Sequence, residues 1–184
     1  MRLTRRAFAV AAGAGLAVLG SRAGSVLARV RVPTGETRYR TLSRAEVATL
    51  ERLADAVVPG SRAAGIARFI DDGLSVAVEK SALTVKYLGV NPPFARFYKD
   101  AIKAAEDAAV RLFGTPVIGL KPAHTNRLVA AIAKAEVRGW TGPPSPLFHF
   151  TLRSDGLDVV YGTRAGFDRL HIPYMAHILP PRDW

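Results

Sequence analysis

The sequence predicts an all-α protein: one small domain of about five helices, with an extended arm before it and an irregular tail at its end. Apolar residues recur three and four positions apart over several segments, which is the spacing of one buried helix face. Proline and glycine separate these segments, and no stretch alternates strongly enough to predict a sheet. We expect the arm over residues 29–41 and the helical domain over residues 42–184.

The first predicted helix begins after Ser43, whose side chain can cap it, and Glu46 can complete a capping box. Pro59-Gly60 ends this helix. A second helix is expected from about Ala64 to Lys80, and Gly73 weakens it slightly.

The third helix has the clearest pattern, because its apolar stripe runs from Phe94 to Phe113, includes Leu112, and ends at Gly114. Asn91 is expected to cap it. A fourth helix should begin near Pro122, which suits a first helical turn, and fade around residues 137–139. A fifth is expected over residues 147–161.

The segment from Thr163 to Trp184 is apolar enough to be buried but too interrupted by proline and glycine to form its own core. It must lie against the helices of its own domain or against another subunit. We therefore expect partner-binding residues in this tail and in the loop before the fifth helix: Trp140, Phe167, Leu170, Ile172, Pro173, Tyr174, Met175 and Ile178.

Residues 1–28 have the layout of an export signal, with a basic start, an apolar run over residues 7–19 and a segment of small residues. The paired Arg5 and Arg6, followed by Phe8, resemble the twin-arginine signal. The run is too short for a membrane span, which needs about 20 apolar residues. We expect protein export by the twin-arginine route, with an uncleaved amphipathic anchor as the alternative.

Charge and cysteine content exclude several classes of protein. The net charge is +11, and residues 29–184 keep 22 basic and 15 acidic residues, a net charge of +7. The basic residues are scattered, which argues against nucleic-acid binding and favours solubility or attraction to an acidic protein or anionic lipid. The absence of cysteine excludes disulfides, covalent c-type haem and thiolate metal sites on this chain.

No catalytic, cofactor-binding or metal-binding site is predicted on this chain. The histidines lack the spacing of three or four residues that places two ligands on one helix face; they are His124, His149, His171 and His177.

The paired carboxylates also have ordinary explanations. Asp71 and Asp72 point about 100° apart on a helix, and Arg68 before them predicts a solvated helix ion pair. Asp155 and Asp158 are likewise expected to be exposed partners of Arg153.

Three segments of the chain carry a resemblance to a known family. The first covers residues 42–71 and includes Val57-Val58-Pro59-Gly60. The second is Phe97-Tyr98-Lys99-Asp100, and the third covers residues 155–174 with Gly166-Phe167 and Ile172-Pro173-Tyr174. Together they resemble the small third subunit of membrane-associated gluconate and related sugar dehydrogenases.

The resemblance implies a non-catalytic accessory subunit of an oxidoreductase complex in the periplasm, attached to the inner membrane through that complex. It implies a large GMC-type partner subunit that carries FAD, a cytochrome subunit that carries haem c, and the twin-arginine translocase as a further partner. In that family the small subunit supplies the export signal for the leaderless large one.

Two other interpretations stay open. A basic protein of this composition can be a peripheral membrane- or envelope-binding protein. Alternatively, a stand-alone periplasmic enzyme can assemble a site from distant residues such as His149, Asp155 and His171.

Overall fold

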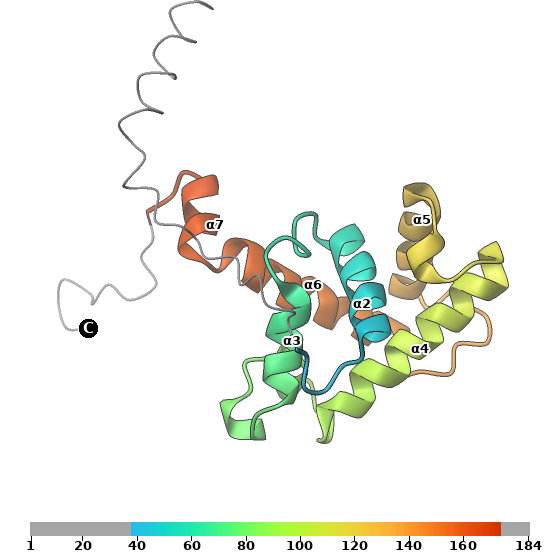
Figure 1. The fold of residues 1–184 in the computed structure, drawn as a ribbon, viewed down its shortest axis with the longest axis horizontal. Helices are drawn as coiled ribbons and strands as arrows, with labels where there is room; N and C mark the ends of the chain where they lie inside the picture. Colours follow the sequence, from blue (N-terminus) through green and yellow to red (C-terminus); the bar gives the residue numbers. More distant parts are fainter. Residues whose placement is uncertain (1–37, 174–184) are drawn as a thin grey trace, which may run out of the picture. The chain divides into compact units, whose positions relative to one another are not determined.

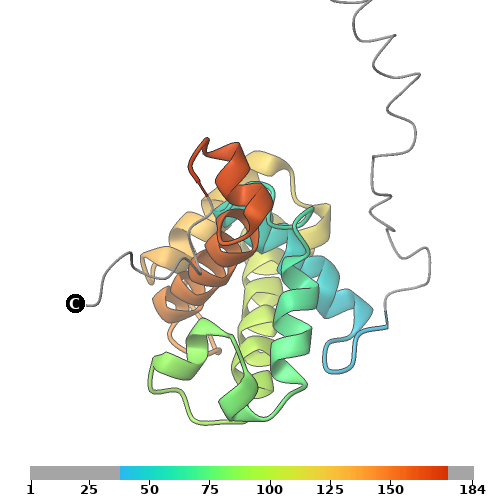
Figure 2. The ribbon, with the colours of Figure 1, turned by 90° about the vertical axis from the view of Figure 1, so that its left-hand side faces the viewer.

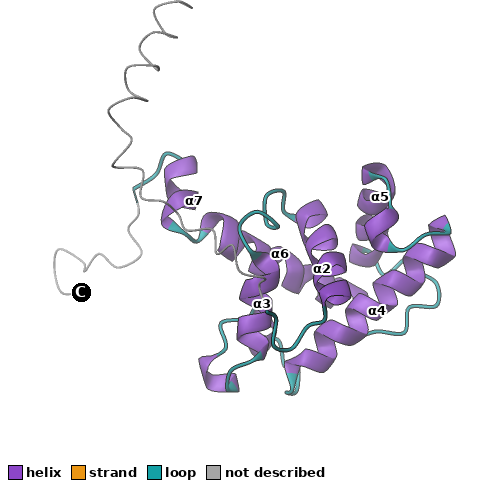
Figure 3. Ribbon diagram, in the orientation of Figure 1, coloured by secondary structure: helices purple, strands orange, loops and turns teal. Residues whose placement is uncertain are grey.

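The structure, a computed structural model, describes residues 38–173, and this part of the chain contains six α-helices and no strand (Figure 1, Figure 3). The all-α prediction is therefore confirmed. The helices are α2 (Arg44–Val57), α3 (Ile66–Leu74), α4 (Phe94–Phe113), α5 (Pro122–Ala133), α6 (Ser145–Tyr161) and α7 (Arg164–Arg169). Three short 3-10 turns connect them: η1 (Val78–Lys80), η2 (Thr84–Tyr87) and η3 (Val117–Gly119).

Several predicted features lie outside the described residues. These are the leader and most of the arm, with Arg5, Arg6 and Phe8, and the end of the tail, with Tyr174, Met175 and Ile178.

The first helix begins as the sequence predicts. The Ser43 hydroxyl accepts a hydrogen bond from the Glu46 backbone N–H at 3.2 Å, and the Glu46 carboxylate accepts from the Ser43 backbone N–H at 2.7 Å. Both bonds of a capping box are present, so two backbone donors at the start of α2 are satisfied.

The core lies where α2 packs against α3, α4, α5 and α6, and α6 also contacts α3 and α4 (Figure 2). Leu50 and Leu53 of α2 are fully buried there, as is Phe148 of α6. The inner stripe of α4 consists largely of alanines from Ala101 to Ala109, and their small side chains let neighbouring helices approach closely.

The second helix is shorter than predicted, because α3 ends at Leu74 and not at Lys80. The chain is tightly packed at this end: a Cβ atom on Gly73 would lie 2.6 Å from Cγ of Leu83. The chain instead forms η1 and η2, which place Leu83 and Val85 in the core with no exposed surface.

Three smaller predictions also prove wrong. Pro93, not Asn91, precedes α4, and no side chain caps that helix. Leu112 does not join the buried stripe but is about half exposed, because it lies in the last turn of α4. The segment after Gly162 is not wholly irregular, since the Thr163 hydroxyl accepts from the Gly166 backbone N–H at 3.1 Å and starts the short helix α7.

Candidate partner-binding surface

Asp155 is fully buried, which contradicts the prediction of an exposed partner for Arg153. Its Oδ2 atom accepts from the Tyr98 hydroxyl at 2.7 Å, and its Oδ1 atom accepts from the Thr84 backbone N–H at 2.9 Å. This carboxylate therefore joins α6 to α4 and η2.

Burial is the main cause of the pKa shifts of Asp155 and Tyr98. Burial raises the pKa of Asp155, and the hydrogen bonds from Tyr98 and Thr84 oppose that rise. Burial also raises the pKa of Tyr98 well above its usual value, as does the neighbouring Asp155. Tyr98 consequently stays a proton donor, and neither buried group is exposed to a ligand in solvent.

Asp71 is also buried, so the predicted solvated ion pair applies only to its neighbour Asp72. The Asp71 carboxylate accepts three backbone hydrogen bonds at 2.8 to 2.9 Å, from residues 40–42. Arg68 pairs instead with Asp72, with 3.6 Å between Nε and Oδ2, and both side chains are largely exposed. The Asp71 carboxylate is thus occupied in anchoring the chain before α2 onto α3.

The histidines of the described chain have separate surroundings. His124 stacks on Phe113 with 4.6 Å between ring centroids, whereas burial and the nearby Arg153 lower the pKa of His149. Within residues 38–173, no group of three or more His, Asp or Glu side chains is placed to hold a metal ion. The Asp155 carboxylate is hydrogen-bonded to Tyr98 and Thr84 and has no exposed surface, whereas His171 is exposed.

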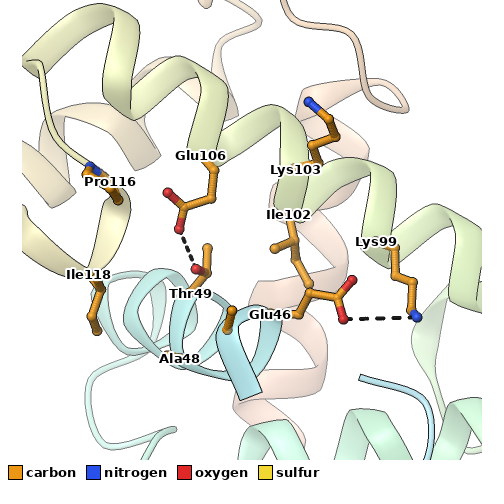
Figure 4. Close-up of a pocket in the computed structure, with 10 residues that line it drawn as sticks. Glu46, Ala48, Thr49, Lys99, Ile102, Lys103, Glu106, Pro116 and Ile118 are labelled. Atoms are coloured by element: carbon orange, nitrogen blue, oxygen red, sulfur yellow. Dashed lines mark hydrogen bonds and ion pairs between the residues drawn. The ribbon is translucent and has the colours of Figure 1, made fainter. Parts of the chain in front are cut away.

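A groove between α2, α4 and η3 has a cavity of about 380 Å³ (Figure 4). Its charged side chains are already engaged. The Glu106 carboxylate accepts from the Thr49 hydroxyl and from the Val117 backbone N–H at 2.9 Å, while Lys99 lies 4.0 Å from Glu46. The remaining walls are apolar: Ala45, Ala48, Ile102, Pro116 and Ile118. This groove therefore suits an apolar group better than a charged metabolite.

Large apolar side chains are also exposed on α6 and after α7. Phe150 is 47% and Leu157 39% exposed, and their spacing of seven residues places them on one face of α6. After α7, Leu170 is 48% and Ile172 47% exposed. We call these four residues the C-terminal surface. Their exposure is what a binding surface requires, because such residues gain free energy when a partner removes them from water.

The predicted partner-binding residues that the structure describes differ in their exposure. Leu170, Ile172 and Pro173 are exposed, whereas Phe167 is half-buried. Trp140 packs partly against the core, and its indole N–H donates to the Pro143 carbonyl, so it contributes to the domain itself.

Phe150 and Leu157 were not among the predicted partner-binding residues. Their spacing of seven residues on the outer face of the fifth helix is the signal that could have identified them.

These observations define a small helical domain: its two buried carboxylates, Asp71 and Asp155, are hydrogen-bonded within the domain, and large apolar side chains are exposed on its described surface. Residues 44–176 match the family described as gluconate 2-dehydrogenase subunit 3, and the chain belongs to that family. It is thus an accessory subunit of a dehydrogenase. Comparison with curated proteins and with solved structures gives no match. Among residues 38–173, no helix has the length and apolar character needed to span a bilayer.

Proposed function

We propose that this chain is the non-catalytic small subunit of a flavin-dependent dehydrogenase acting on a sugar, polyol or sugar acid. It binds the large GMC-type subunit, carries it through the twin-arginine route, and stabilises it in the periplasm. FAD then belongs to the large subunit, and haem c to a cytochrome subunit, since a chain without cysteine cannot attach a c-type haem.

The observation that carries this proposal is the combination of family membership with the exposed apolar residues of the C-terminal surface. The match covers residues 44–176, which include all of the C-terminal surface. The two buried carboxylates, Asp71 and Asp155, are fully engaged in holding loops. The exposed leucines, isoleucine and phenylalanine supply the apolar anchors that protein interfaces need.

An escort role is consistent with the chemistry of the partner. A flavoprotein binds its cofactor only when folded, and the twin-arginine route carries folded proteins. One leader with Arg5 and Arg6 on the small subunit then serves both chains, provided that the two associate before export.

The test is expression of the leaderless large subunit with and without this chain, followed by assay of dehydrogenase activity in the periplasm. We expect activity there only when the small subunit is present. Equal periplasmic activity in its absence would remove the escort role.

Two double variants separate export from assembly. Replacement of Arg5 and Arg6 by lysine should leave an active complex in the cytoplasm. L170S/I172S should instead weaken co-purification of the two subunits while the helical domain stays folded. Val76→Ser is the matched control, because Val76 is also a large exposed apolar residue but lies outside the C-terminal surface.

A further inference from the structure

The outer face of α5 carries basic residues that form no ion pair with an acidic side chain of residues 38–173. The segment from residue 108 to residue 135 contains Arg111, Lys121, Arg127 and Lys134 and no Asp or Glu. All four of these side chains are exposed. Within the described residues none of them forms an ion pair, whereas Arg62, Arg68, Arg96, Lys99 and Lys103 each do.

Helical geometry places these charges together. Arg127 and Lys134 are seven residues apart, and His124 precedes Arg127 by three, so the three lie on one side of α5. The opposite side, with Leu128 and Ile132, is buried in the core. The basic side therefore faces solvent along the full length of the helix.

The end of α4 belongs to the same region. α4 and α5 pack against each other (Figure 1). The stacked rings of Phe113 and His124 join the end of α4 to the start of α5. Arg111 donates to the Gly139 carbonyl at 3.3 Å, which brings the exposed Arg138 toward this end. Val110 and Leu112 in the last turn of α4 are each about half exposed.

The exposed Glu136 follows Lys134 by two positions, and the other acidic residues near α5 lie along its other flank. Glu51 and Asp55 of α2 line a groove with Pro122 and Asn126, and Arg62 lies 3.2 Å from Glu51. They do not interrupt the row formed by His124, Arg127 and Lys134.

We propose that this basic face, formed by His124 and Arg127 of α5, by Lys121 and Lys134 at its two ends and by Arg111 of α4, docks on an anionic lipid surface. Lys121 and Lys134 are 13 positions apart, or about 20 Å along the helix, and neither of them lines the two grooves described above. A lipid surface presents a continuous layer of negative charge and needs no shaped groove. The inference concerns the chain's own surface and does not depend on the proposed dehydrogenase partner.

Vesicle binding of the full chain tests this proposal. Vesicles containing phosphatidylglycerol should bind the protein, and vesicles of phosphatidylcholine alone should bind it far less. Binding should fall steeply toward about 1 M NaCl, where the screening length shrinks to about 3 Å. Each basic residue near such a surface contributes roughly a fivefold factor, so R127Q/K134Q should lower the partition coefficient about 25-fold.

The control is K80Q/R164Q, which removes the same charge from exposed positions in η1 and α7. It should lower binding by no more than about threefold, the effect of net charge alone. Equal losses in the two variants would show that this face has no special role. Circular dichroism of both variants confirms that the helices are retained.

A site-specific probe separates this face from the leader, which also contains an apolar run. The chain has no cysteine, so Ala130→Cys and Ala165→Cys each provide one labelling position. Ala130 is exposed between Arg127 and Lys134, and Ala165 is exposed on α7.

An environment-sensitive dye at position 130 should shift to the blue when anionic vesicles are added, and a dye at 165 should not. No shift at 130, or a shift only at 165, would overturn the proposal. Binding to soluble polyglutamate without any shift on vesicles would overturn it in favour of an acidic protein partner.

Discussion

Replacement of Tyr98 by phenylalanine should destabilise the domain by about 2–3 kcal/mol. The Tyr98 hydroxyl has no exposed surface and donates at 2.7 Å to Oδ2 of Asp155, which is itself fully buried. The substitution keeps the ring but leaves Oδ2 without its donor. Hydrogen bonds to charged groups contribute about 1.5–3 kcal/mol, and an unpaired buried acceptor retains its desolvation cost.

Urea and thermal unfolding of the full chain measure this loss. For a domain of this size we expect the melting temperature to fall by about 5–10 °C. Tyr87→Phe is the matched control, because Tyr87 is 74% exposed and its substitution should change stability by no more than about 0.5 kcal/mol.

The pH dependence gives a second test with a defined sign. Burial holds the pKa of Asp155 above its ordinary value of 3.8, and the Tyr98 hydroxyl lowers it. Without that hydroxyl the pKa rises further, so the folded variant takes up a proton at a higher pH than the wild type does. Proton uptake by the folded state stabilises it, and the difference in stability should therefore shrink as the pH falls from about 7 to 5. A difference below about 0.5 kcal/mol at neutral pH, or one that grows on acidification, would refute this reasoning.

Three further changes have expected outcomes. Asp71→Ala leaves the backbone N–H groups of residues 40–42 without their acceptor. The free energy of unfolding in urea should fall by about 3 kcal/mol, and trypsin should cleave this segment faster. An unchanged rate of cleavage would contradict the anchoring role. Gly166→Ala would place Cβ 2.5 Å from Cα of Tyr161. We therefore expect the free energy of unfolding to fall by about 1–3 kcal/mol. A variant as stable as the wild type would show that α7 does not need this close approach. Burial chiefly lowers the pKa of His149 in the folded state, so the unfolded chain binds a proton more readily. The wild type should therefore lose stability relative to His149→Gln as the pH falls below about 6.5. Stability profiles that stay parallel in the two proteins would rule this out.

The local features of this fold could be predicted from the sequence because their causes lie within a few residues. The capping box of Ser43 and Glu46 spans three residues, and the buried stripe of α4 repeats with the helical period. Pro122 likewise starts α5, as expected of a proline in the first turn of a helix. In these cases the neighbouring residues carry all the information that the prediction requires.

The predictions that proved wrong concern residues whose contacts lie in distant parts of the chain. Asp71 accepts from backbone groups about 30 positions away, and Asp155 pairs with Tyr98 at a separation of 57. Each is a charged residue within a predicted helix and has an arginine nearby in sequence, so the default expectation is a solvated ion pair. The early end of α3 has the same origin, since Gly73 lies against Leu83 of the following loop.

The positions of the two buried carboxylates also explain how a small helical domain can act through its surface. Asp71 anchors the chain just before α2, at the point from which the segment bearing the predicted leader continues. Asp155 holds η2 against α4 and α6. Because charge buried in the core must be paired, both groups stabilise loops and are unavailable for chemistry. The exposed apolar residues lie on α6 and after α7, whereas the basic residues lie on α4, on α5 and at the two ends of α5, so the two proposed contacts, with a dehydrogenase subunit and with a lipid surface, use different residues.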